Sequence, residues 1–311
     1  MPINGSIKKI AIVGPTAIGK TAFSISLAEH IGAEIISVDS MQVYRYMDIG
    51  TAKPSREERQ RVSHHLIDVA FPDENYHTGR FVNDSRVAIQ EIAGRGKIPL
   101  LVGGTGLYLK GLLEGIFELP EISPAIRMEI DRRCVEHGPK AMHQRLALVD
   151  PDMAAKIHPN DSQRIKRGLE IYEETGKTWS EHIQRQKNQK MSNCLILGLT
   201  TADRTVLYER INRRSCLMME EGFVEEVQNL LNMGYSASLK TMQSIGYRHI
   251  IDFLNNKRNM HDTVLQLARD TRRYAKRQYT WFNRVPGLQW FESTAHEQMA
   301  DRAMAFLDSS L

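Results

Sequence analysis

A phosphate-binding motif near the start of the chain constrains the fold more than any other feature. The segment from Gly14 to Thr21 matches G-x-x-x-x-G-K-[ST], follows an apolar run at Ile10–Val13 and precedes apolar residues at helical spacing up to Gly32. In such a strand–loop–helix, glycines let backbone amides turn toward an anion, and the helix N-terminus adds partial positive charge. We predict a diphosphate- or nucleotide-binding loop in which Lys20 reaches the terminal phosphate oxygens and Thr21 is the Mg²⁺ ligand. The loop comprises Gly14, Pro15, Thr16, Ala17, Ile18, Gly19, Lys20 and Thr21.

The bulk properties narrow the class of protein. With 311 residues, 41% of them hydrophobic, the chain can bury a full core and is long enough for two structural units. Its apolar stretches fall far short of the roughly 20 residues that a membrane span needs, and no signal-peptide pattern is present. We therefore expect a cytoplasmic protein with no membrane contact. Three widely spaced cysteines favour reduced thiols over a disulfide or zinc framework, and we expect no structural metal.

Short apolar or β-branched runs recur along the first two thirds of the sequence, and helical patterns separate most of them. This alternation predicts an α/β fold, a P-loop parallel sheet flanked by helices. The expected strands are Ile7–Val13, Glu34–Val38, His65–Val69, Ile98–Val102 and Cys194–Leu199.

Strand signals vanish between Pro120 and Lys190. This segment has helical patterns broken at Gly138-Pro139, Asp150-Pro151 and His158-Pro159. We predict an all-helical insertion domain at residues 120–190 within a catalytic core of residues 1–119 and 191–311. After Leu199 the apolar spacing is again helical, including a long segment at Met260–Phe282.

Polar residues follow two of the expected strands, at the sheet edge where parallel sheets bind ligands. Asp39, Ser40, Met41 and Gln42 follow the second strand, and Gly103-Gly104-Thr105-Gly106 follows Ile98–Val102. Asp39 is either a functional carboxylate or an ordinary turn residue, and Thr105 can cap a helix as well as contact a ligand.

A P-loop nucleoside triphosphatase normally carries a Mg²⁺-binding acid after a second apolar strand. Here Ile98–Val102 ends in glycines, and Asp68 is the remaining candidate for that role, with a surface turn as the alternative. The lack of a clear metal-binding acid argues mildly against nucleotide hydrolysis. Adjacent His64 and His65 would face opposite sides of a strand, so we interpret them as structural.

The positive charge is concentrated in one segment. Residues 263–284 carry a local charge of +5, in a chain whose formal charge is +4. On a helix, Arg269, Arg272, Arg273, Lys276, Arg277 and Thr280 form one stripe, the basic ridge. A solvated face would mix acids with bases, so contact with a phosphate backbone is the favoured interpretation. For Arg164, Lys166 and Arg167 of the insertion, spacing alone favours a plain surface over a ligand contact, and Arg127 is either a surface charge or a cationic lid.

Taken together and in order, these motifs resemble the bacterial tRNA dimethylallyltransferase family from the first strand almost to the last helix. One departure is Asn283, where arginine is usual in the family, and we expect no C-terminal zinc finger of the kind that eukaryotic relatives carry. The motifs are the loop Gly14–Thr21; Ser37-Val38-Asp39-Ser40 with Gln42 and Tyr44; Asp48–Pro54; Gly103–Tyr108; His158–Asp161 with Arg164; Gly246-Tyr247-Arg248; and Lys276–Phe282.

The resemblance implies transfer of a dimethylallyl group from dimethylallyl diphosphate to the exocyclic amine of the adenine 3′-adjacent to the anticodon of tRNA. It assigns Asp39 as the general base and Thr105 as a residue that orients the reacting groups. Arg127, the phosphate loop and Mg²⁺ would together stabilise the negative charge on the departing diphosphate. The target base would be extruded from the anticodon loop, and the insertion would grip the anticodon stem.

The family's tRNA-contact segments map onto four parts of this sequence. We expect a monomer with no obligate protein partner. The residues are Asp39, Ser40, Met41 and Gln42; Gln163, Arg164, Ile165, Lys166 and Arg167; Gln243, Ser244, Ile245, Gly246, Tyr247 and Arg248; and Arg273, Lys276, Arg277, Gln278, Tyr279, Thr280, Trp281, Phe282 and Asn283.

Three other functions remain open from the residues. A P-loop kinase of nucleotides or small molecules would prefer ATP to dimethylallyl diphosphate. A non-enzymatic RNA-binding switch would bind tRNA without Lys20 or Asp39. Prenylation of free adenine nucleotides would make the basic ridge and the insertion unnecessary.

Overall fold

The computed structural model describes residues 7–115, 121–185 and 193–309 and divides the chain into two compact units. Unit 1 consists of residues 1–113 and 191–311, and unit 2 of residues 114–190. The sequence placed the helical insertion at residues 120–190.

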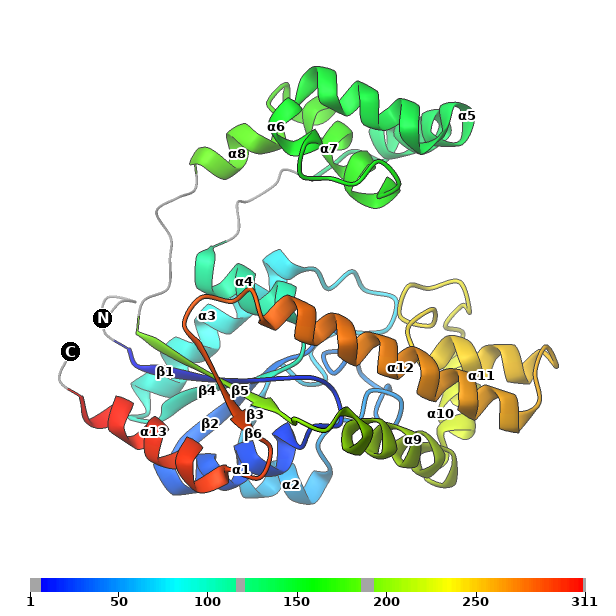
Figure 1. Ribbon diagram of the computed structural model, residues 1–311. Coiled ribbons are helices and arrows are strands. Elements are labelled where there is room, and N and C mark those ends of the chain that lie inside the picture. The colour runs from blue at the N-terminus through cyan, green and yellow to red at the C-terminus, as the bar shows by residue number, and fades with distance from the viewer. Residues whose placement is uncertain (1–6, 116–120, 186–192, 310–311) are drawn as a thin grey trace. The chain divides into compact units, whose positions relative to one another are not determined.

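Unit 1 is built on a parallel sheet with the strand order β3-β2-β4-β1-β5-β6 (Figure 1). Each described strand pair is parallel, which confirms the predicted α/β class. The strands are β1 Lys9–Val13, β2 Ala33–Val38, β3 His64–His65, β4 Ile98–Gly103, β5 Cys194–Thr200 and β6 Leu288–Glu292.

Two strands differ from the sequence prediction. The run His65–Val69 is extended only at β3, because Leu66 and Asp68 adopt positive φ angles of 60° and 58° and leave the sheet. The edge strand β6 was not predicted. Most of its residues are half-buried, so no continuous apolar run marks it.

The helices of unit 1 begin and end at recognisable signals. Gly32 ends α1 with a positive φ of 65°, as its sequence position predicted. Ser55 and Glu58 form a capping box on α2, and Asn259 caps α12. The helices are α1 Lys20–Ile31, α2 Arg56–Arg61, α3 Thr78–Gly94, α4 Gly106–Glu114, α9 Arg204–Glu220, α10 Phe223–Asn232, α11 Tyr247–Leu254, α12 Met260–Phe282 and α13 His296–Asp308.

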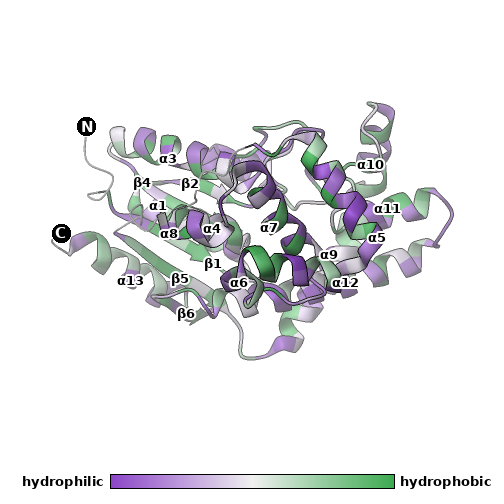
Figure 2. Cartoon of the chain, turned by 90° about the horizontal axis from the view of Figure 1, so that it is seen from above, coloured by the Kyte–Doolittle hydropathy of each residue, from purple (hydrophilic) through white to green (hydrophobic). Residues whose placement is uncertain are grey.

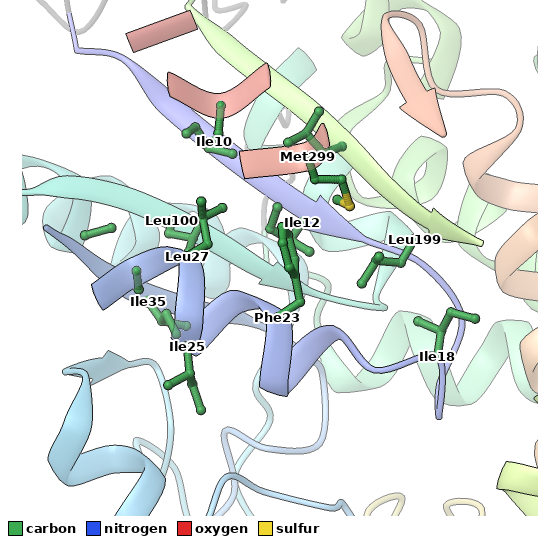
Figure 3. Packing of buried hydrophobic residues seen from close by; sticks show 14 of the residues in the cluster. Ile10, Ile12, Ile18, Phe23, Ile25, Leu27, Ile35, Leu100, Leu199 and Met299 are labelled. Carbon is green, nitrogen blue, oxygen red and sulfur yellow. The ribbon is translucent and has the colours of Figure 1, made fainter. Parts of the chain in front are cut away.

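One core of unit 1 lies between the sheet and helices α1 and α13, while α3 and α4 pack on the other face (Figure 1). Phe23 and Leu27 of α1 pack with Ile10 and Ile12 of β1, and Met299 of α13 joins the same cluster (Figure 3). Ile10, Ile12 and Met299 are fully buried. Each such side chain contributes about 1.5–3 kcal/mol, which fixes β1 and therefore the loop that follows it.

Unit 2 is helical, with hydrophilic and hydrophobic residues alternating along its helices (Figure 2). Its own core includes Ile130, Leu146, Ile165 and Leu169. The predicted break at Gly138-Pro139 is a kink inside α5, where Gly138 has a φ of 75°. The helices are α5 Pro124–Val149, α6 Pro151–Ala154, α7 Ser162–Thr175 and α8 Trp179–Arg185.

Across the described residues, no helix is both long and apolar enough to span a bilayer.

Candidate active site at the carboxyl ends of the central strands

The strand register brings three loops together. Val13 of β1 and Val38 of β2 both lie opposite Gly103 of β4, so the three strands end at the same level. The loops that follow, starting at Gly14, Asp39 and Gly104, therefore share one edge of the sheet, as the sequence predicted.

The phosphate loop uses positive φ angles at Gly14 (144°), Ala17 (64°) and Gly19 (108°). A Cβ added to Gly14 would lie 2.6 Å from the carbonyl oxygen of Leu199, so only glycine fits there. Gly19 precedes the first residue of α1. The loop thus ends at a helix N-terminus, where free amides and the helix dipole favour an anion.

The Lys20 side chain folds back and hydrogen-bonds to the backbone of the phosphate loop. Its Nζ donates to the carbonyl oxygens of Gly14 at 3.0 Å and Pro15 at 2.7 Å. Burial lowers the pKa of Lys20 to about 7; the charge of Asp39 opposes this shift and that of Arg214 adds to it. The protonation of Lys20 near neutral pH is therefore sensitive to any anion that enters the loop.

Arg214 is a site residue that the sequence prediction missed. It lies on α9, where its guanidinium interacts electrostatically with Lys20 and Asp39, and burial lowers its pKa. The signal was present: Leu207, Ile211 and Met218 are buried on one face of α9, and Arg214 falls in that series. An arginine at an otherwise apolar helix position needs an anionic partner.

Asp39 is held in a fixed turn. Its Oδ1 accepts hydrogen bonds from the backbone N–H groups of Met41 at 2.8 Å and Gln42 at 3.2 Å. The turn interpretation of Asp39 is therefore correct, and it is compatible with a functional one, because the turn uses Oδ1 alone and Oδ2 is available to a substrate.

Thr105 joins the loop after β4 to the Asp39 turn. Its hydroxyl accepts from the N–H of Ser40 at 3.0 Å. The carbonyl of Thr105 accepts from Tyr108 and Leu109 as α4 begins, so the expected helix contact is made by its backbone. Tyr274 of α12 hydrogen-bonds to Thr105, and burial together with the charge of Asp39 raises the Tyr274 pKa.

Gln278 connects two of the three loops from the side of α12. Its Oε1 accepts from the N–H of Thr16 at 2.8 Å, and its Nε2 donates to the carbonyl oxygen of Gly104 at 2.9 Å. The Thr16 amide is thus directed to Gln278 instead of the interior of the phosphate loop. Trp281, one turn on, lies where a Cβ on Gly106 would be, 2.1 Å from its nearest ring atom.

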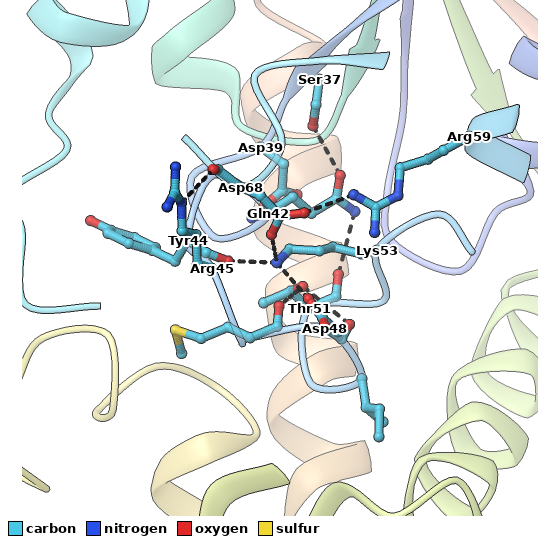
Figure 4. A network of polar contacts seen from close by, with 12 residues as sticks. Ser37, Asp39, Gln42, Tyr44, Arg45, Asp48, Thr51, Lys53, Arg59 and Asp68 are labelled. Atoms are coloured by element: carbon cyan, nitrogen blue, oxygen red, sulfur yellow. Dashed lines mark hydrogen bonds and ion pairs between the residues drawn. The ribbon is translucent and has the colours of Figure 1, made fainter. Parts of the chain in front are cut away.

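Beyond the Asp39 turn, a polar network holds residues 42–54 (Figure 4). Ser37 donates to the Gln42 Oε1 at 2.9 Å, and the Gln42 Nε2 donates to the Ala52 carbonyl at 3.1 Å. The Gln42 side chain therefore supports its own loop. Lys53, 2% exposed, pairs with Asp48 and Asp68, each at 2.6 Å.

Asp68 does not fit the metal-binding role for which it was a candidate. Its carboxylate pairs with Lys53 at 2.6 Å and Arg59 at 2.7 Å. Burial opposes ionisation, but the hydrogen bonds from these two cations lower the Asp68 pKa overall. With both oxygens engaged, Asp68 is a structural ion-pair residue. In the described parts of the chain, no cluster of three or more acidic, histidine or cysteine side chains could hold a metal.

The basic ridge lies on the outer face of α12. Arg269, Arg273, Lys276 and Arg277 are exposed, whereas Arg272 is half-buried and donates to Asn212. The acid of this segment, Asp270, pairs with Arg248 at 2.6 Å, His249 at 3.1 Å and Arg273 at 3.3 Å. Burial would raise the Asp270 pKa, but hydrogen bonds from His249 and Arg248 lower it to about 2.

The residues expected to contact tRNA fall into exposed, half-buried and buried groups. The buried side chains face the core in this structure and support their elements, so at these positions a side chain is not presented to a ligand. The exposed residues are Gln163, Arg164, Gln243, Arg273, Lys276, Arg277, Thr280 and Asn283. The half-buried residues are Asp39, Ser40, Met41, Gln42, Lys166, Arg167, Ser244, Ile245, Arg248, Tyr279 and Trp281. The buried residues are Ile165, Gly246, Tyr247, Gln278 and Phe282.

The candidates in unit 2 lie on its helices. Arg127 is exposed on α5, and Lys166 of α7 pairs with Asp131 at 2.6 Å. Asp161 caps α7, as the sequence suggested. A role for Arg127 over the phosphate loop stays a prediction.

Comparison with known proteins identifies the family. A model described as IPP transferase matches residues 42–285, and one described as isopentenyl transferase matches residues 7–74. The tRNA dimethylallyltransferase of Desulfotalea psychrophila is 48% identical over 303 residues, which cover 97% of this chain and 96% of the relative. The chain belongs to the tRNA dimethylallyltransferase family. That of Carboxydothermus hydrogenoformans is 47% identical and covers 93% of each chain.

Solved structures agree with this assignment. The tRNA isopentenylpyrophosphate transferase of Bacillus halodurans has a TM-score of 0.72 at 38% identity, with 97% of each chain covered. A eukaryotic dimethylallyltransferase acting on tRNA has a TM-score of 0.82 at 32% identity, covering 96% of this chain and 78% of that one. The predicted family and fold are confirmed, the chain is a prenyltransferase, and the P-loop kinase alternative is not favoured.

Proposed function

We propose that the protein transfers the dimethylallyl group of dimethylallyl diphosphate to the exocyclic amine of the adenine 3′-adjacent to the tRNA anticodon. The observation that carries this proposal is that Asp39 interacts electrostatically with Lys20 of the phosphate loop and with Arg214 of α9. A leaving diphosphate needs the cations, and an amine that gains an alkyl group needs the base.

The phosphate loop would receive the diphosphate. Amides at the α1 N-terminus, Lys20 and Arg214 would bind its oxygens and stabilise the charge that grows on it as it departs. Arg127 of unit 2 would add a further cation. The site also fits Mg²⁺, because this ion takes few protein ligands together with substrate oxygens, and Thr21 lies in the first turn of α1 next to Lys20. Bound there, Mg²⁺ would neutralise part of the diphosphate charge.

Asp39 would act as the general base. The nitrogen lone pair of the adenine amine forms the new C–N bond, and the electrons of the breaking C–O bond leave with diphosphate. The amine proton passes to the Asp39 Oδ2. Thr105 keeps the Asp39 turn in place through Ser40, so its effect on the reacting atoms is one of orientation.

The tRNA would bind along the exposed basic ridge of α12 and along unit 2. Lys276 and Arg277 are exposed cations on the helix whose inner face carries Tyr274 and Gln278, the residues that contact the site loops. Phosphate contacts there would offset the cost of extruding the target base, a few kcal/mol. Such a substrate places the enzyme in the cytoplasm, and the proposal requires one copy of the chain.

The test is incubation of the protein with labelled dimethylallyl diphosphate and an unmodified anticodon stem-loop, followed by mass analysis of the nucleosides. We expect prenylated adenosine at the position 3′ of the anticodon, and free diphosphate. Binding of the stem-loop without product would instead indicate an RNA-binding switch, and prenylation of free adenine nucleotides at equal rate would remove the role of the ridge.

The role of Asp39 is tested by Asp39→Asn, which keeps the shape of the turn but removes the base. We expect turnover to fall by a factor of about 10² to 10⁴, with tRNA affinity nearly unchanged. Single-turnover rates and equilibrium binding of the stem-loop separate the two quantities. An equal loss of both would rule out the base role.

A further inference from the structure

The burial of Gln278 is not explained by the tRNA contact that was expected for this residue. Its side chain is 5% exposed, although it lies two residues from Lys276 and next to Arg277, which are both exposed on the ridge. It therefore points inward from the helix that carries the ridge. An amide side chain so buried must satisfy its donor and its acceptor within the protein.

The acceptor and the donor of the Gln278 side chain both form hydrogen bonds, each to a different loop of the site. The acceptor Oε1 binds the N–H of Thr16 in the phosphate loop at 2.8 Å, and the donor Nε2 binds the carbonyl of Gly104 at 2.9 Å. A Cβ on Gly104 would lie 2.2 Å from that Nε2, so the chain has no room for a side chain where Gln278 approaches. Gly104 in turn precedes Thr105, which holds the Asp39 turn through Ser40.

We propose that Gln278 is a positioning residue: it fixes the phosphate loop to the loop that carries Thr105, and so sets the distance between the diphosphate and Asp39. This inference rests on the proposed function and replaces the tRNA contact expected at this position. The amide offers a donor and an acceptor at every pH, whereas an ionised carboxylate has acceptors only and an apolar group has neither.

The first test is Gln278→Glu across a range of pH. A protonated carboxyl has one O–H donor and one carbonyl acceptor, so it can bind Gly104 and Thr16 as the amide does. Once ionised it has acceptors only and faces the Gly104 carbonyl without a donor. We expect KM for dimethylallyl diphosphate near the wild-type value at low pH, and about 10- to 100-fold higher where the carboxyl is ionised. Each value is divided by that of wild-type protein at the same pH, which removes any pH dependence that the two proteins share.

The second test is Gln278→Met, which keeps the volume but makes neither bond. Here the loss of affinity should be independent of pH. We would measure binding of inorganic diphosphate by calorimetry, so that the result does not depend on which acceptor the enzyme prenylates. Binding of the anticodon stem-loop should stay within about two-fold of wild type, because the ridge side chains are untouched.

The matched control is Gln228→Glu on α10, an exposed glutamine that bonds to Asn232, where the same change should leave both affinities unaltered. Wild-type diphosphate affinity in Gln278→Met would overturn the proposal. So would a loss of stem-loop affinity as large as the loss of diphosphate affinity, since that would make Gln278 a tRNA contact or a general support. If wild-type protein prenylates no tRNA, the proposed function fails, while diphosphate binding still decides the role of Gln278.

Discussion

The protonation of Lys20, a single buried amine, should change when a ligand binds to the phosphate loop. Its pKa of about 7 reflects burial, which penalises the ammonium form. A diphosphate in the loop would favour the charged form and raise this pKa again. Above pH 7 the free protein holds Lys20 largely neutral, so binding must take up a proton there. Below pH 7 Lys20 is already charged and takes up none.

We therefore expect the affinity for inorganic diphosphate to fall as pH rises above 7. Calorimetry at pH 8 in two buffers of different ionisation enthalpy measures the protons taken up directly. Lys20→Met is the control and should bind weakly, without proton uptake. Equal heats in the two buffers for the wild-type protein would mean that Lys20 remains charged when free.

At the residue scale, the sequence predicts features that depend on local backbone conformation. It misses contacts between residues that are far apart in the sequence. The glycines of the phosphate loop and the turn at Asp39 follow from short-range geometry, so both were predictable. Arg214 and Gln278 lie far along the chain from Lys20 and Gly104. Their roles depend on which faces of α9 and α12 meet the site, and helical spacing alone does not say which buried polar residue meets which partner.

At the scale of elements, α12 has two faces with different tasks. Its outer face carries the exposed cations, and its inner face packs Gln278 and Trp281 on the site loops. The ridge was predictable because charge and helical period are both visible in sequence. The strand at β3 was predicted too long, because the positive φ at Leu66 ends it, and the half-buried edge strand β6 was not predicted, because no continuous apolar run marks it.

The double change Arg273→Ala with Lys276→Ala tests the outer face. We expect weaker stem-loop binding for every stem sequence, because phosphates carry no sequence information. The slope of log affinity against log salt should become shallower by about 1 to 2. Binding titrations at several salt concentrations measure it.

The control for this test is Arg61→Ala on α2, which removes an exposed cation paired with Glu29. It should leave the slope unchanged. A slope in the double variant equal to that of wild type would place the tRNA elsewhere on the protein.

At the scale of the whole molecule, two clusters of buried residues in the described parts of the chain, one in each unit, share no residue. One cluster joins the sheet to α1, α9 and α13, and the other lies among the helices of unit 2. The cluster of unit 1 draws its residues from segments on both sides of unit 2 and includes none of the inserted residues.

Replacing residues 114–190 by a flexible Gly/Ser linker should therefore leave unit 1 folded. We expect inorganic diphosphate still to bind, with only the contribution of Arg127 lost, and stem-loop affinity to fall at least about ten-fold. Circular dichroism, calorimetry and stem-loop titration report the three quantities. Undiminished stem-loop affinity would remove unit 2 from tRNA binding, and an unfolded product would show that the cores are coupled.

The position of α13 has a consequence for how the protein is made. Met299 and Ala303 are fully buried in the cluster that contains Ile10 and Phe23, and Lys8 donates to the carbonyl of Leu307 at 2.7 Å. During translation the segment that forms α1 leaves the ribosome long before the segment that covers it. For most of its synthesis the nascent chain therefore carries an unshielded apolar flank, the kind of surface to which chaperones bind.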